Sequence, residues 1–177
     1  MQALLLPFVR TRRGAPVLSM VAVGQHQMNF EITDFENNKH RDQVISLWKD
    51  AFGYEASHNF PDIVIDKKVE FNDGLFFVAI DNDTVIGTVM AGYDGHRGWI
   101  YSMVVSQVYR KKGLGSALLS FAEGRLSAKG CMKINLQIME GNELVEAFYL
   151  ANGYLAEKRT SMGKCLTQNI KNSKQSL

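Results

Sequence analysis

Cysteine and proline are scarce in this chain, and it has no long apolar run. The 177 residues include three prolines and two cysteines, Cys131 and Cys165. Because the cysteines lack the spacing of a zinc site or a redox motif, we expect two free thiols, no metal centre and a cytoplasmic location. No apolar run approaches the roughly 20 residues that a membrane-spanning helix needs, so we expect no membrane partner.

An excess of charge of one sign is also missing. The formal net charge at pH 7 is +2, from 20 basic and 18 acidic residues. Domains that bind nucleic acid usually carry a larger basic excess, so the charge argues against such a partner. The 46% hydrophobic and 21% charged residues are typical of a globular protein. This length indicates one domain whose core needs no disulfides.

Acidic residues are absent from the first 27 positions. Residues 1–27 begin with an apolar run, but their arginines follow that run instead of preceding it, unlike a secretory signal. We expect an N-terminal extension there, with an arm that packs on the domain as the alternative. The folded domain is predicted to span residues 28–166, and residues 167–177 are predicted to form a polar tail.

Hydrophobic periodicity and turn residues predict alternating strands and helices. The predicted strands cover residues 30–35, 75–80, 85–93, 99–105, 132–139 and 154–162, and the predicted helices cover residues 39–52, 63–71, 113–130 and 143–152. The middle three strands should form an antiparallel meander, and the helix after them should be a right-handed crossover that places strands 99–105 and 132–139 parallel. We therefore expect an α/β (α+β) fold with a mixed, mostly antiparallel sheet flanked by helices.

A basic, glycine-containing loop precedes the helix predicted at 113–130. It reads Arg110-Lys111-Lys112-Gly113-Leu114-Gly115. The first N–H groups of a helix lack intrahelical partners and the helix dipole favours anions, while glycine lets a ligand approach closely. The loop lacks the Lys-Ser/Thr of a phosphate-binding Walker loop, and Leu118 stands where a dinucleotide fingerprint needs a third glycine. The alternative is a basic turn before a surface helix.

This loop resembles the R/Q-x-x-G-x-G/A loop of the GNAT superfamily of acyl-CoA-dependent N-acyltransferases. Two further matches follow the family's order: a strand ending like L-x-V and an N-x6-Y pattern with a later Gly-aromatic pair. They are Met103-Val104-Val105, Asn142 with Tyr149, and Gly153-Tyr154. The resemblance spans about residues 28–165 and is greatest to small bacterial YpeA-like members.

The resemblance implies acetyl-CoA as acyl donor and a role for each matching residue. The strand 99–105 would splay from its parallel neighbour and pair its open edge with the pantetheine arm. The region of Val104 or Val105 would polarise the thioester carbonyl, and Tyr149 would protonate the leaving thiolate. Asn142 would contact the ligand, although its residue type also suits a helix N-cap. The predicted cofactor-binding residues are Met103, Val104, Val105, Arg110, Lys111, Lys112, Gly113, Leu114, Gly115, Ser116 and Asn142.

The sequence identifies the general base and the acceptor pocket less clearly than the cofactor site. Many relatives carry a glutamate two residues before the L-x-V leucine, but Tyr101 stands there in this chain. The base could instead be Asp94, His96, Glu55, Asp50 or a chain of water. We predict that the acceptor contacts Trp48, Asp94, His96 and Tyr101. Core packing is the alternative for Trp48, which lies on an apolar helical stripe, and an exposed turn is the alternative for His96.

The resemblance implies an N-acetyltransferase that moves an acetyl group directly from acetyl-CoA to a primary amine of a small molecule or a protein N-terminus. A CoA-binding module without catalysis is the alternative, because the expected base is missing. A second alternative is a toxin-like member of the family that acetylates tRNA. The near-neutral net charge of the chain argues against it. The sequence leaves the oligomeric state open, a homodimer included.

Overall fold

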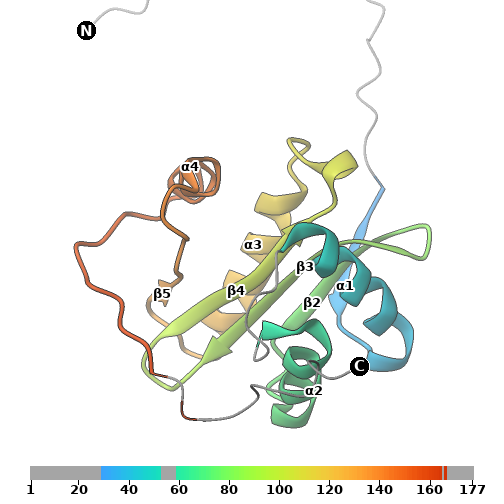
Figure 1. The fold of residues 1–177 in the computed structure, drawn as a ribbon, viewed down its shortest axis with the longest axis horizontal. Coiled ribbons are helices and arrows are strands. Elements are labelled where there is room, and N and C mark those ends of the chain that lie inside the picture. Colours follow the sequence, from blue (N-terminus) through green and yellow to red (C-terminus); the bar gives the residue numbers. More distant parts are fainter. Residues whose placement is uncertain (1–28, 53–58, 165, 167–177) are drawn as a thin grey trace, which may run out of the picture.

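A five-stranded sheet separates the helices into two layers (Figure 1). The computed structural model describes residues 29–52, 59–164 and 166. In chain order the elements are β1 (Glu31–Asp34), α1 (Asn37–Ala51), α2 (Pro61–Phe71), β2 (Phe76–Asp81), β3 (Thr84–Tyr93), β4 (Gly98–Val105), the short 3-10 helix η2 (Gln107–Tyr109), α3 (Leu114–Ala128), β5 (Ile134–Asn135) and α4 (Glu143–Ala151).

The sheet has the predicted mixed topology. Its strand order is β1-β2-β3-β4-β5, and every neighbouring pair is antiparallel except β4 with β5, which are parallel. The crossover through α3 joins the two parallel strands, as expected for a strand–helix–strand unit. The α/β prediction with a mostly antiparallel sheet is therefore confirmed.

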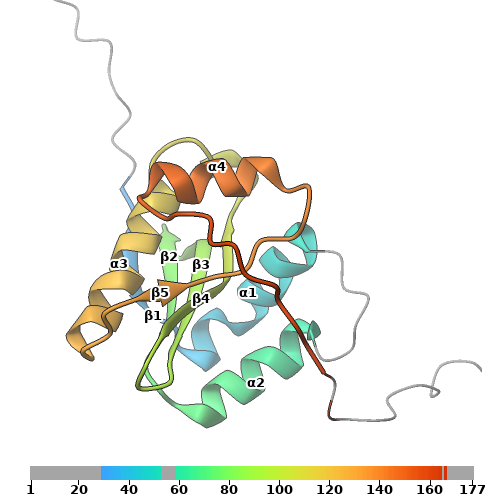
Figure 2. The same ribbon diagram turned by 90° about the vertical axis from the view of Figure 1, so that its left-hand side faces the viewer.

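Each face of the sheet carries its own apolar core. On one face, α1 buries His40, Val44 and Trp48, which are spaced four residues apart and so share one side of the helix. On the other face, α3 buries Leu118 and Ala122, among others. Figure 2 shows α3 on one side of the strands and α1 with α2 on the other. The sheet is consequently covered on both faces, and its ligand-accessible parts are its ends and edges.

Two predicted strands differ from the structure. The strand predicted at 132–139 is reduced to β5, because only Ile134 and Asn135 stay beside β4 before the chain diverges. Residues 154–162 form no strand: they run past β5 and contact its segment through side chains, Lys133 with Glu157 and Gln137 with Ser161. Both contacts join residues with the same spacing in sequence, so the two segments run in the same direction without a backbone ladder between them.

Some helices begin and end at capping residues and not where the hydrophobic periodicity begins and ends. Helix α2 begins two residues before the predicted range, because Pro61 occupies its first turn, where a missing N–H costs nothing. It ends at Phe71, and the next residue, Asn72, has a left-handed backbone that suits a C-terminal cap. Helix α4 begins after Asn142, as predicted. Among the described residues, no helix combines the length and apolar character needed to cross a membrane.

Candidate functional site

The antiparallel pairing of β3 with β4 contains a bulge. Thr88 lies opposite Val104 and Met90 lies opposite Tyr101, so β4 has two residues where β3 has one. Ser102, one of these two, has a φ of +48°, which few residues other than glycine adopt. An extra residue of this kind bends a strand and leaves its ladder locally disrupted.

Beyond the bulge, the side chains of β4 point to the opposite faces of the sheet from those expected for a regular strand. Ile100 packs in the core cluster on the α3 face, and Met103 and Val105 join that same cluster although an unbroken strand would send them to the other face. Val104 instead packs with α1 and α2. The bulge thereby directs the Met103 side chain towards α3 and α4.

One edge of β4 is open over most of its length. The pairing with β5 involves only Gly98 and Trp99, at the start of the strand. No described strand pairs with this edge from Ile100 to Val105. An unpaired edge offers backbone N–H and C=O groups to an extended ligand, which can add to the sheet as a further strand.

The open edge leads directly into the start of α3. The turn after η2 places Lys111 and Gly113 at positive φ values of 58° and 85°. Ala117 makes the first intrahelical bond, to the Gly113 carbonyl, so the preceding N–H groups of the helix have no intrahelical acceptor. The first turn contains no acidic residue, and a Cβ placed on Gly113 would meet no atom within 4 Å. Open space in front of unpaired N–H groups suits a phosphate.

The three cations of the loop have different surroundings. Arg110 Nε donates to the Val105 carbonyl at 3.0 Å, which ties the loop to the end of β4. Lys112 Nζ lies 5.8 Å from the centre of the Tyr109 ring. Both lysines of the loop are exposed, so they add positive potential in front of the helix without fixed ion-pair partners among the described residues.

Strand β4, helix α3 and helix α4 converge beside this loop. A Cβ built on Gly115 would lie 3.2 Å from Phe148 Cε2 and 3.7 Å from Met103 Cε, so the lack of a side chain there permits close packing. The Tyr149 hydroxyl donates to Met103 Sδ at 3.5 Å. The residues that sequence reasoning assigned to three separate motifs are thus brought together.

Tyr149 combines a buried ring with a weakly engaged hydroxyl. Its side chain is only 8% exposed, and its ring makes edge-to-face contacts with Phe148 and Tyr154. Burial raises the pKa of Tyr149 to about 12, so the phenol is protonated at neutral pH. Because a thioether sulfur is a weak acceptor, the proton is available to a stronger acceptor that approaches. Core packing and proton donation are compatible at this position.

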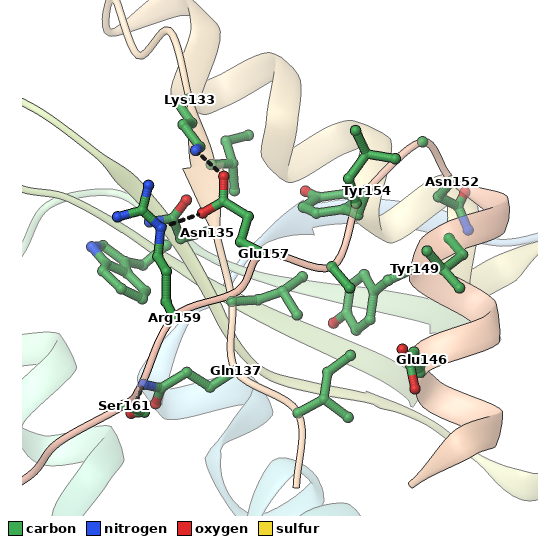
Figure 3. Close-up of a pocket in the computed structure, with 18 of the residues that line it drawn as sticks. Lys133, Asn135, Gln137, Glu146, Tyr149, Asn152, Tyr154, Glu157, Arg159 and Ser161 are labelled. Atoms are coloured by element: carbon green, nitrogen blue, oxygen red, sulfur yellow. Dashed lines mark hydrogen bonds and ion pairs between the residues drawn. The ribbon is translucent and has the colours of Figure 1, made fainter. Parts of the chain in front are cut away.

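Asn142 has the structural role that its residue type allows. It caps α4, and its Oδ1 accepts the Val145 N–H at 3.4 Å. Asn142 is exposed and is one of the residues that line a hollow of about 1400 Å³ between the segment after Cys131, α4 and residues 154–161. Figure 3 shows this hollow with Tyr149, Tyr154 and Glu157 around it. Tyr149 lines the same hollow, whereas the loop 110–116 does not. The expected anion site therefore rests on backbone geometry and not on a cavity.

Trp48 does not line a pocket. It is 1% exposed, and its Nε1 donates to Thr88 Oγ1 at 2.8 Å inside the core that α1 shares with the sheet. This burial agrees with core packing, the alternative that the sequence left open for Trp48, because its position on the buried stripe of α1 leaves it little exposed surface for an acceptor.

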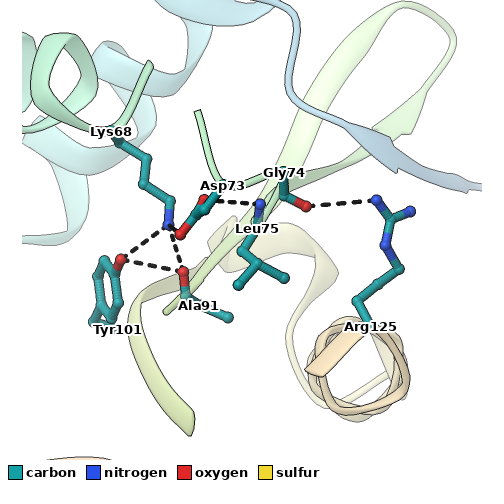
Figure 4. Close-up of polar contacts among 7 residues, drawn as sticks. All are labelled: Lys68, Asp73, Gly74, Leu75, Ala91, Tyr101 and Arg125. Atoms are coloured by element: carbon teal, nitrogen blue, oxygen red, sulfur yellow. Dashed lines mark hydrogen bonds and ion pairs between the residues drawn. The ribbon is translucent and has the colours of Figure 1, made fainter. Parts of the chain in front are cut away.

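Tyr101 lies on the α2 side of β4 and is 40% exposed. Its hydroxyl donates to the Ala91 carbonyl at 3.1 Å and accepts from Lys68 Nζ at 3.1 Å (Figure 4). Its ring borders a hollow of about 380 Å³ with Phe71 and Met90. Tyr101 therefore keeps a surface for an acceptor, but its hydroxyl is already engaged.

Asp94 and His96 lie in the turn between β3 and β4, away from the converging elements. Asp94 Oδ1 accepts the N–H groups of His96 at 2.7 Å and Arg97 at 2.6 Å, and these bonds lower the pKa of Asp94. The length of β4 separates this turn from the loop by roughly 20 Å. The structure does not bring either residue to Tyr149, since the turn lies at the other end of the strand. Asp50 is exposed at the end of α1, and Glu55 lies outside the described residues.

Lys68 and Thr88 are buried polar residues that sequence reasoning missed. Lys68 Nζ pairs with Asp73 Oδ2 at 2.6 Å and donates to the Ala91 carbonyl at 2.5 Å. Thr88 is fully buried between α1 and β4. Thr88 has no local signal, because its partners Trp48 and Ser102 are distant in sequence. Lys68 has a near partner in Asp73, but its contacts with Ala91 and Tyr101 on the sheet are distant in sequence.

Comparisons with known proteins agree with this geometry. The model of the acetyltransferase (GNAT) family matches residues 41–154. A protein named acetyltransferase from Yersinia pestis (strain Pestoides F) is 37% identical over 137 residues, which are 77% of this chain and 92% of that protein.

Solved structures extend the likeness to the fold. The PaiA N-acetyltransferase of Thermoplasma acidophilum, in complex with coenzyme A, has a TM-score of 0.65 at 19% identity, over 75% of this chain and 94% of that one. Glucosamine-6-phosphate N-acetyltransferase of Arabidopsis thaliana has a TM-score of 0.58 at 21% identity, over 78% and 99%. The family model covers most of the sheet, the loop and α4, and with the 37% identical relative it shows that this chain belongs to the acetyltransferase (GNAT) family.

Proposed function

We propose that this protein transfers an acetyl group from acetyl-CoA directly to a primary amine, on a small molecule or at a protein N-terminus. The observation that carries the proposal is the continuity of the open β4 edge with the start of α3, beside the Tyr149 hydroxyl. The open edge can pair with an amide-containing arm, and the N–H groups at the start of α3 can bind a pyrophosphate. The Tyr149 hydroxyl can donate a proton beside both.

The cofactor-binding residues have distinct tasks in this proposal. The backbone of Met103, Val104 and Val105 pairs with the pantetheine amides, and a backbone N–H in this stretch polarises the thioester carbonyl. Removing one such donor typically slows acyl transfer ~100-fold or more. The N–H groups from Lys111 to Ser116 hold the pyrophosphate, with the loop lysines neutralising its charge. Asn142 contacts the bound donor from the start of α4.

The transfer forms a C–N bond and breaks a C–S bond. The neutral amine attacks the thioester carbon, the thiolate leaves, and Tyr149 protonates the sulfur. The attacking amine must lose a proton. Asp94 is engaged in its turn and Tyr101 is bonded to Ala91 and Lys68, so we assign this step to a relay of water molecules and to no side chain of the residues that the structure describes.

The test is release of the CoA thiol in the presence of a panel of amines and of peptides with free N-termini, with mass spectrometry of the acceptor. We expect thiol release that depends on one class of acceptor, and an acetylated product. Binding of acetyl-CoA without turnover on any acceptor would favour the non-catalytic module, for which the missing carboxylate at position 101 is the specific observation. No binding of acetyl-CoA would contradict both.

A further inference from the structure

A hydrogen-bonded chain of three residues crosses from α1 to the bulge of β4. Trp48 Nε1 donates to Thr88 Oγ1 at 2.8 Å, and Thr88 Oγ1 donates to the Ser102 carbonyl at 3.1 Å. Trp48 is 1% and Thr88 0% exposed, and they lie beside an apolar cluster that includes Val44 and Ile65. A buried polar pair in apolar surroundings costs free energy unless its hydrogen bonds are made. The geometry of these two hydrogen bonds is therefore tightly fixed.

The direction of the hydrogen bonds follows from the groups themselves. An indole N–H only donates and a backbone carbonyl only accepts. The Thr88 hydroxyl must therefore accept from Trp48, and its own proton is left for the Ser102 carbonyl. Trp48 thus sets the orientation of the hydroxyl that holds Ser102.

Ser102 is the point at which β4 departs from regular geometry. Its positive φ of 48° is strained for a residue with a side chain, and such a backbone persists only where the surroundings hold it. Its place in the bulge turns Met103 to the α3 face, where Met103 contacts the Tyr149 hydroxyl and lies near Gly115. A contact that fixes the Ser102 carbonyl therefore fixes the part of the open edge next to Tyr149.

We propose that Trp48 and Thr88 are positioning residues that hold the β4 bulge in the shape needed to receive the acyl-pantetheine arm. This inference rests on the proposed function, since it concerns the edge along which acetyl-CoA would bind. Neither residue touches the donor. Both act through the Ser102 carbonyl, and neither contributes to the loop that would hold the pyrophosphate.

The experiment compares two ligands that differ in the arm. Acetyl-CoA would contact both the edge and the loop, whereas adenosine 3′,5′-bisphosphate lacks the arm and would contact only the loop. Thr88→Val keeps the shape of the side chain and removes the hydroxyl. Thr88→Ser retains the hydroxyl, and Ile65→Val is a control for mild loss of packing in the same core.

We expect Thr88→Val to bind acetyl-CoA about tenfold or more weakly and to bind the bisphosphate with unchanged affinity. Thr88→Ser should restore acetyl-CoA binding, and Ile65→Val should alter neither affinity. Equal losses for both ligands, or no loss for either, would overturn the positioning role. Should Thr88→Val fail to fold, Trp48→Phe decides by the same comparison, because it removes the N–H donor that orients the Thr88 hydroxyl and keeps an aromatic ring, although the smaller ring also leaves some space in the core.

The parent protein separates this inference from the proposed function. If the parent binds acetyl-CoA no more tightly than the bisphosphate, the edge does not receive the arm and the proposed function fails first. If the parent prefers acetyl-CoA and the Thr88→Val and Trp48→Phe variants keep that preference, only the positioning role fails.

Discussion

At the scale of single residues, Tyr149 shows how one side chain can serve both core and chemistry. Its ring packs against two aromatic neighbours, while among the described residues its hydroxyl donates only to the weak sulfur acceptor of Met103. The hydroxyl of Tyr154, in contrast, has a strong acceptor: it donates to Glu123 at 2.8 Å. The contrast between the two tyrosines provides a matched pair for experiment.

Tyr149→Phe should lower kcat by roughly 100- to 10,000-fold, the range for general acid catalysis, and should leave acetyl-CoA affinity unchanged. The ring stays, so the melting temperature should hardly change. Tyr154→Phe, the control, should keep its turnover. Steady-state kinetics with an active acceptor measure the kcat of both variants. A kcat of Tyr149→Phe within about twofold of the parent would show that Tyr149 is not the acid.

His40 predicts a pH dependence of stability. It is buried, and its Nδ1 accepts the Glu36 N–H at 2.9 Å, with burial as the main cause that lowers its pKa. The unfolded chain takes up this proton near pH 6.5, whereas the folded chain resists it, so stability should fall as the pH drops below about 6.5.

The check uses His40→Asn, which keeps an acceptor near the position of Nδ1 but does not titrate. Urea unfolding of both proteins at pH 7 and pH 5 should show a larger loss of stability for the parent than for the variant. Parallel losses in the two proteins would show that His40 does not control the pH response.

Residue identities were predictable where a local pattern carried them. Short motifs singled out the loop 110–115 and Tyr149, and the structure places both beside Met103, while their roles stay predictions. For Trp48 the pattern allowed two readings, and burial decides for the core. The burial of Lys68 and Thr88 could not be predicted, because it depends on contacts with Ala91 and Trp48, which are remote from them in sequence.

At the scale of elements, the buried Lys68 joins α2 to the sheet. Lys68 and Asp73 have side chains that are 7% and 15% exposed, and Lys68 also bonds Ala91 and Tyr101 (Figure 4). These contacts join α2 to both strands that carry the bulge. The exposed surface around Tyr101 on β4 therefore depends on the position of α2.

Lys68→Met should destabilise the protein by about 3 kcal/mol, because it leaves the Asp73 carboxylate without its partner in a largely buried position. Adding Asp73→Asn should recover part of the loss, since the unpaired charge is then gone. Lys67→Met, at the exposed neighbouring position, is the control and should change stability by less than about 0.5 kcal/mol. Urea unfolding measures all three, and equal effects at positions 67 and 68 would contradict the role of the ion pair.

Element types were predictable from periodicity, but their interruptions were not. The meander, the crossover and all four helices appear near their predicted ranges. The bulge could not be predicted, because Ser102 is not a glycine and gives no sign of a left-handed backbone. The strand predicted at 154–162 fails because a strand needs a backbone ladder with a neighbour, and this segment contacts the β5 segment through side chains alone.

At the scale of the whole molecule, the buried core of the described residues comes from the segment between His40 and Tyr149. We propose residues 28–166 as the complete catalytic domain. A chain that begins at Met28 should melt within a few degrees of the full chain and bind acetyl-CoA equally. A large drop in melting temperature would show that residues 1–27 pack on the domain or on a partner subunit.

The central claim is that acetyl-CoA binds with its pyrophosphate at the start of α3, and calorimetric titration of two Gly113 variants tests it most directly. Asp and Asn both tolerate the left-handed backbone at this position and have the same size, so Gly113→Asn controls for strain and bulk. Gly113→Asp adds a negative charge in the open space before the unpaired N–H groups. We predict that Gly113→Asp binds acetyl-CoA at least about tenfold more weakly than Gly113→Asn, a difference of about 1.4 kcal/mol. Equal affinities of Gly113→Asp, Gly113→Asn and the parent would contradict the claim.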